Sequence, residues 1–148
     1  MSISVAAHAI VNVGEQLVVE SSSPKAAFGV VFEDDGDTGY FYGIDLSRKP
    51  QAILDALLIY DVAQVLDRDV SSTIQIAWSS DGLSAALLLN SDPHAIFDFA
   101  AHRGYCRMKS PISSSGWTKH DHAWDENAWL RMQSQASCAL DMSYMTYI

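Results

Sequence analysis

Three groups of side chains in this sequence could do chemistry, and the first is a short acidic run. Asp34, Asp35 and Asp37 place three carboxylates within four residues, and hard cations such as calcium bind clustered oxygens. The run lacks the glutamate that closes a calcium-binding loop at its twelfth position. We therefore expect either a tight turn with solvated charges or an acidic patch that recognises a protein partner.

The second group is a pair of histidines before a predicted helix. His120 and His122 occupy alternate positions, so they point the same way if the segment is extended. A zinc site needs at least three protein ligands. The further candidates are His94, His102, Asp98 and Cys106. Nothing in the sequence brings these residues close. We therefore expect the segment to be an ordinary loop and the protein to hold no metal and no other cofactor.

The third group combines cations with an aromatic ring. Arg103 and Arg107 precede Trp117, and arginine suits carboxylate or phosphate ligands. In one interpretation the arginines hold an anion, Trp117 stacks on it, and His120 or His122 moves a proton near neutral pH. In the other, these cations pair with the acid-rich remainder of the same domain.

Short catalytic motifs are missing from the sequence. It contains no Gly-x-Ser-x-Gly elbow, no P-loop, no dinucleotide fingerprint and no His-Glu-x-x-His pair. We therefore assign no catalytic residue and favour a protein that is not an enzyme.

The elements that must position these groups are mainly strands. Runs of β-branched and aromatic residues alternate with turn residues from Val11 to Phe99, with one helical interruption, and a further short strand is expected after them. Glu33–Thr38 contains an Asp-Gly pair and predicts a hairpin turn. Short turns between successive strands predict an antiparallel meander of about seven or eight strands. The expected strands are Leu17–Glu20, Ala26–Phe32, Gly39–Ile44, Thr73–Trp78, Leu83–Leu89, Ala95–Phe99 and Tyr105–Met108.

Two helices are predicted beside this sheet. Pro50 opens a stretch in which apolar residues recur at spacings of three and four, so we expect a main helix over about 50–65, packed on one face. Asp55 falls on the polar side of that helix. Asp121 could cap a short helix near 122–132. The fold class is therefore α+β, with one domain over 1–132 and a C-terminal tail over 133–148.

Composition limits the class of partner. The chain has 148 residues, and 9 basic against 18 acidic side chains give a net charge of −9. Residues 1–100 hold 14 acids and 4 bases, a net of −10, whereas residues 101–148 hold 4 acids and 5 bases, a net of +1. Nucleic acid is disfavoured as a partner, because its binding depends on a basic surface.

Three sequence features bear on the compartment of the protein. No basic residue precedes the apolar N-terminal segment, and its apolar run is interrupted by His8, so a signal peptide is not expected. Apolar runs such as Ala85–Leu89 are far shorter than the roughly 20 residues of a membrane span. Cys106 and Cys138 match no metal or redox spacing, which favours free thiols. We expect a cytoplasmic protein without a membrane partner.

Four segments together resemble an uncharacterised family of small bacterial proteins, a domain of unknown function. They are FGVVFEDDGDTGYFYGID, ILDALLIYDV, HAIFDFAAHRGYCR and WTKHDHAWDENAW, and the resemblance covers about residues 26–132. It implies a bacterial, cytoplasmic protein and supports the domain limits, but it carries no activity and no site residues to this chain.

Two functions follow as hypotheses. The first is a small acidic binding module of the immunity-protein type, which recognises a basic protein partner. The alternative is an enzyme or small-ligand protein with an anion pocket near Arg103–His122. A homodimer, formed through a sheet edge or the aromatic-rich C-terminal part, is a further expectation.

Overall fold

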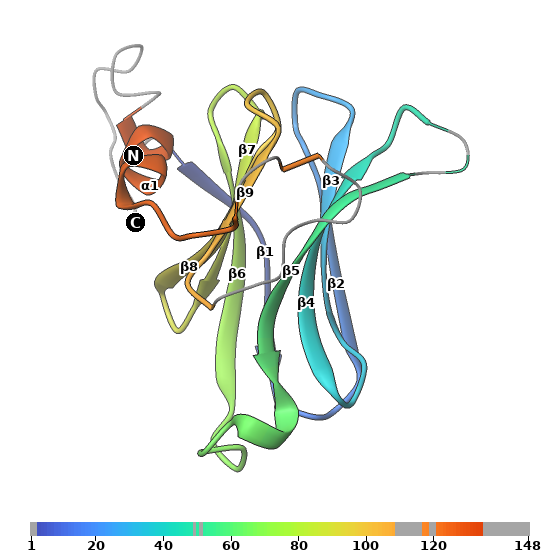
Figure 1. Cartoon of the computed structure of the whole chain (residues 1–148), viewed down its shortest axis with the longest axis vertical. Helices are drawn as coiled ribbons and strands as arrows, with labels where there is room; N and C mark the ends of the chain where they lie inside the picture. The colour runs from blue at the N-terminus through green and yellow to red at the C-terminus, as the bar shows by residue number, and fades with distance from the viewer. Residues whose placement is uncertain (1–2, 49, 51, 109–116, 119–120, 135–148) are drawn as a thin grey trace.

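The computed structural model describes residues 3–48, 50, 52–108, 117–118 and 121–134. These residues form nine strands, one short 3-10 helix (η1, Val62–Gln64) and one α-helix (α1, Glu126–Ser134), as Figure 1 shows. The strands are β1 (Ile3–Val11), β2 (Leu17–Ser22), β3 (Phe28–Asp34), β4 (Thr38–Asp45), β5 (Ala52–Asp61), β6 (Ser72–Ser79), β7 (Ser84–Leu89), β8 (Asp92–Asp98) and β9 (Arg103–Cys106).

The strands make two sheets rather than the single sheet predicted. One has the order β2-β3-β4-β5, the other β1-β6-β7-β8-β9, and every pairing between these strands is antiparallel. Each sheet contains a meander, so the predicted connection by short turns is confirmed in coarse form. The hairpin expected at Glu33–Thr38 is confirmed as the β3–β4 connection.

The main helix predicted over 50–65 is wrong. Ala52–Asp61 forms strand β5, which pairs with β4, and only Val62–Gln64 forms a short helix. A near-continuous apolar run fits a buried strand as well as a helix, because periodicity alone does not distinguish them. The β4–β5 register has two irregularities, and at one of them Ile59 has no partner in β4, so that the adjacent side chains of Ile59 and Tyr60 are both buried. An apolar stripe at helical spacing is therefore compatible with this bulged strand.

The core lies between the inner faces of the two sheets. Phe41 of β4 and Phe97 of β8 meet across the layers with ring centroids 5.3 Å apart. Phe99 stacks on Phe28 at 4.5 Å and lies 6.0 Å from Trp78. These rings interlock the layers because offset and tilted aromatic pairs pack well at such distances.

Helix α1 covers the outer face of the five-stranded sheet (Figure 1). Its buried side chains pack with the outward residues of β6, β7 and β8, forming a second apolar cluster. The cluster contains Ala77, Ala86, Leu88, Ile96, Tyr105, Ala128, Trp129 and Met132. The short C-terminal helix is therefore present, but it begins at Glu126 rather than near 122. Residues 135–148 of the predicted tail lie outside the described part.

In the described ranges, no helix combines the length and apolar character that crossing a bilayer requires.

Candidate functional site

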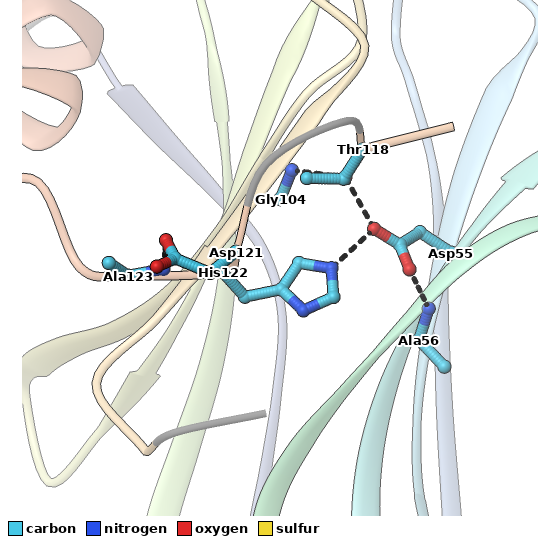
Figure 2. Close-up of polar contacts among 7 residues, drawn as sticks. All are labelled: Asp55, Ala56, Gly104, Thr118, Asp121, His122 and Ala123. Atoms are coloured by element: carbon cyan, nitrogen blue, oxygen red, sulfur yellow. Dashed lines mark hydrogen bonds and ion pairs between the residues drawn. The ribbon is translucent and has the colours of Figure 1, made fainter. Parts of the chain in front are cut away.

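A buried hydrogen-bond cluster centres on Asp55 of β5. Its Oδ2 accepts hydrogen bonds from His122 Nε2 at 2.8 Å and from Thr118 Oγ1 at 2.5 Å. Its Oδ1 accepts one from the backbone N–H of Ala56 at 2.9 Å. Figure 2 shows the carboxylate held between its own strand and the segment that carries Thr118 and His122. We call Asp55, Thr118 and His122 the buried triad.

The buried triad joins the two sheets along one side. Thr118 Oγ1 accepts a hydrogen bond from the N–H of Gly104 in β9, and the N–H of Cys106 donates to the carbonyl of His122. Cys106 Sγ also donates to the carbonyl of Leu58 in β5. The triad therefore fastens an edge strand of one sheet to an edge strand of the other.

Electrostatics favour the ionised form of Asp55. Burial would raise the pKa of Asp55, but the hydrogen bonds from His122 and Thr118 outweigh burial and lower its pKa below the ordinary value. An ionised carboxylate only accepts hydrogen bonds, so His122 carries its proton on Nε2. The side chains of His122 and Asp55 are 0% and 1% exposed. A pair sealed in this way cannot meet a substrate in this conformation, so its geometry supports a structural role.

The predicted acidic run divides into a buried and an exposed part. Asp34 is 1% exposed, and it accepts hydrogen bonds from the N–H of Gly14, the N–H of Gly36 and the hydroxyl of Tyr60. These contacts join the β1–β2 turn, the β3–β4 turn and strand β5. Burial and the neighbouring carboxylate raise the pKa of Tyr60, which therefore stays a donor. Asp34 is thus part of the scaffold rather than the surface.

Asp35 and Asp37 remain on the surface. Asp35 Oδ1 accepts from the backbone N–H groups of Asp37 and Thr38, each at 2.9 Å, and these bonds lower the pKa of Asp35. The carbonyl of Asp37 accepts a hydrogen bond from the N–H of Val62 at 2.9 Å. The hairpin turn is thereby attached to η1, which follows β5.

Three loops consequently meet at the lower end of the molecule in Figure 1. They are residues 12–16, 34–38 and 61–71, and a hollow of about 570 Å³ is lined by residues from all three. Their acids outside the core are Glu15, Asp35, Asp37, Asp61, Asp67 and Asp69, of which only Asp61 is half-buried. Arg68 is the single cation in these three loops. We call this surface the acidic end.

Exposed apolar side chains lie within the same surface. Leu66 is 96% exposed and Val70 is 65% exposed, and both belong to the third loop of the acidic end. Leu66 lies in the loop after η1, beside Asp67.

The other predicted site residues each contact different partners. Arg107 stacks on Trp124 at 4.2 Å, and its guanidinium lies 3.6 Å from the carboxylate of Glu126. Arg103 lies 4.9 Å above the ring of Tyr105. Of these contacts only the one between Arg107 and Glu126 is an ion pair, and Glu126 lies in the last third of the chain rather than in the acid-rich residues 1–100.

Trp117 and the histidine pair complete the predicted group. Trp117 packs against Phe97 and Phe99 and stacks on His102 at 5.3 Å. His122 lies in the buried triad, whereas His120 lies outside the described residues. Among the described residues, no three histidine, cysteine, aspartate or glutamate side chains gather as a metal site.

Sequence reasoning missed Asp55 and Thr118. The predicted helix placed Asp55 on its polar side, and Thr118 was not among the predicted site residues. One signal was present: Asp55 interrupts the apolar run from Ile53 to Tyr60, and an acid buried in such a run requires hydrogen-bond partners.

The fold and its site define a small two-sheet β protein with a sealed carboxylate–histidine pair and one acidic end. Residues 11–133 match the family described as "Uncharacterized protein conserved in bacteria (DUF2251)", and the chain belongs to this family. The resemblance predicted from the sequence is therefore confirmed.

One curated relative comes from Haemophilus influenzae and is called "Uncharacterized protein". It is 42% identical over 96 residues, which are 64% of this chain and 60% of that protein. The match thus spans less than two thirds of the relative's length. No solved structure matches this chain.

Proposed function

We propose that this chain is a small binding module of the immunity-protein type, and that its acidic end recognises a basic protein partner. The observation that carries the proposal is the convergence of three loops on one surface. That surface presents six exposed or half-buried carboxylates against one arginine, with two exposed apolar side chains among them.

Charge supports the choice of a basic partner. Unlike charges across an interface accelerate encounter and suppress wrong partners, and loops that protrude from a scaffold bring these charges to the partner first. The scaffold beneath the acidic end is fixed by Asp34, which binds two of the loops and β5. A preformed surface reduces the entropy lost on binding.

Apolar contact supports a protein rather than a small cation as the ligand. A side chain as exposed as Leu66 gains little from the folded monomer, whereas burial in an interface removes its apolar surface from water. Val70 lies four residues further along the same loop. Apolar centres with a charged border are the usual arrangement of protein interfaces.

The proposal is tested with two matched triple variants of the whole chain. The first, Asp37→Asn, Asp67→Asn and Asp69→Asn, removes three charges from the acidic end. The control, Glu20→Gln, Glu33→Gln and Asp92→Asn, removes the same number of charges from other exposed or half-buried positions. The wild-type chain and both variants are used as bait in extracts of the native host at low salt, and the retained proteins are identified by mass spectrometry.

We expect a basic protein that the wild-type chain and the control retain and the acidic-end variant loses. With the purified pair, the association rate of the acidic-end variant is expected to fall about tenfold at low salt. Equal retention by both variants, or retention of no basic protein by the wild-type chain, contradicts the proposal.

A further inference from the structure

Strand β1 is an edge strand without charge. It pairs with β6 on one side and ends the five-stranded sheet on the other. Its sequence, ISVAAHAIV, contains no aspartate, glutamate, lysine, arginine or proline, although the whole chain has a net charge of −9. Edge strands usually carry charge or proline, because an open row of backbone groups otherwise pairs with another chain.

The other three edge strands are protected. β9 is covered by the segment after it, because the N–H of Cys106 donates to His122 and Cys106 forms a bridge with Ala123. β5 carries Asp55 and Asp61 and lies against β9 through the Cys106–Leu58 hydrogen bond.

β2 is the shorter edge strand of the other sheet. It has six residues, and Glu20 stands exposed in its middle. Of the four edges, β1 alone therefore has neither a covering segment nor a charge within the part of the chain that the structure describes.

Strand β1 exposes two large apolar side chains. Val5 is 50% exposed and Ile10 is 68% exposed, with the exposed His8 between them. Ala7 and Ala9 point the other way and are only partly buried against the core. A strand laid along this edge would place its own side chains beside both rows.

From these observations we infer that β1 pairs antiparallel with β1 of a second copy of this chain, joining two five-stranded sheets about a two-fold axis. An antiparallel pair of identical strands is self-complementary, as a two-fold interface requires. The inference does not depend on the proposed function, because the acidic end takes no part in it.

Charge selects a second copy as the occupant. Two chains of net charge −9 repel one another over acidic surfaces, so a neutral strand is the place where they can approach. A basic partner, by contrast, gains no ion pair from β1. The same neutrality that leaves this edge unprotected therefore suits self-association.

Antiparallel pairing also separates the two acidic ends. A bulge between Val5 and Ala7 leaves Ala7–Val11 as the regular stretch, and Val11 leads into the first acidic loop. If Val11 faces Ala7 of the second copy, the two Val11 residues lie roughly 14 Å apart at about 3.4 Å per residue. This separation exceeds the Debye length of about 8 Å at physiological salt, so repulsion between the ends is screened.

The test is sedimentation velocity of the whole chain from about 1 to 200 µM, a range that brackets micromolar association. Ile10→Lys places a charge on the β1 edge, and Ile53→Lys is the matched control. Ile53 is 60% exposed on β5, an edge strand of the other sheet. Both variants change the net charge equally, and circular dichroism checks that both fold.

We expect a wild-type dimer that Ile10→Lys weakens about tenfold and Ile53→Lys leaves within about twofold, because a new charge at a strand pair disfavours pairing. A wild-type monomer throughout, or equal weakening by both variants, overturns the inference. Hydrogen exchange of the wild-type chain decides the matter if Ile10→Lys does not fold. β1 amides must exchange more slowly as protein concentration rises, and exchange independent of concentration overturns the inference.

Discussion

Replacement of Asp55 tests whether the buried triad fastens the two sheets. In Asp55→Ala, His122 Nε2 and Thr118 Oγ1 lose their shared acceptor, and the backbone N–H of Ala56 loses its own. His122 and Thr118 are both buried, so water does not readily replace the carboxylate.

The expected magnitude follows from that burial. Removing one partner of a buried, hydrogen-bonded charge pair costs about 3–5 kcal/mol, because the remaining polar groups stay buried without an acceptor. This is a large fraction of the roughly 5–15 kcal/mol that stabilises a typical domain. With a urea dependence of about 2 kcal/mol per molar, the unfolding midpoint at pH 7 should fall by about 2 M.

Asp61→Ala is the matched control for this change. Asp61 lies in the same strand but is half-buried and accepts only the N–H of Ala63 among the contacts described, so its loss should cost about 1 kcal/mol. If Asp55→Ala destabilises the chain no more than Asp61→Ala, the triad does not fasten the sheets.

The pH dependence has a defined sign. Hydrogen bonds lower the pKa of Asp55 in the folded state, so its contribution to stability is full above its unfolded pKa of about 4. The contribution is lost as the pH falls through the folded pKa. The stability difference between wild type and Asp55→Ala should therefore shrink below about pH 4. If this difference in the free energy of unfolding stays constant down to pH 2, Asp55 is not ionised in the folded chain.

Two further predictions concern the scaffold and the arginines. Asp34→Ala removes the acceptor of the Gly14 N–H and the Tyr60 hydroxyl, so we expect the free energy of unfolding measured in urea to fall by about 2–4 kcal/mol. A fall of less than about 1 kcal/mol would contradict the scaffold role of Asp34. Arg107→Ala removes an exposed cation stacked on Trp124, so the free energy of unfolding should fall by about 1 kcal/mol or less. A fall of more than about 2 kcal/mol would contradict the expectation that this exposed contact adds little to stability.

The local signals in the sequence predicted the hairpins well. Asp35 and Gly36 turn the chain between β3 and β4 as expected, because Gly36 takes a φ of +102° that glycine adopts readily. The run from Ile53 to Tyr60 was assigned wrongly. Its apolar spacing satisfied a helix, whereas pairing with β4, which a local pattern does not contain, makes it a strand.

The candidate site was only partly predictable for the same reason. The acidic run predicted three surface carboxylates, but Asp34, its first residue, is buried and accepts hydrogen bonds from two backbone N–H groups and a tyrosine. Asp55 and His122 are 67 positions apart, and only the tertiary fold brings them to 2.8 Å. The convergence of three loops on the acidic end likewise depends on long-range contacts.

We propose that the acidic end, rather than net charge in general, recognises a basic protein. The most direct test of this proposal is the salt dependence of the association rate with the purified partner, measured for the wild-type chain and both triple variants. We predict a steep fall with added salt for the wild type and for the Glu20, Glu33 and Asp92 control, and a much shallower fall for the Asp37, Asp67 and Asp69 variant. An equally steep fall for all three would contradict the claim.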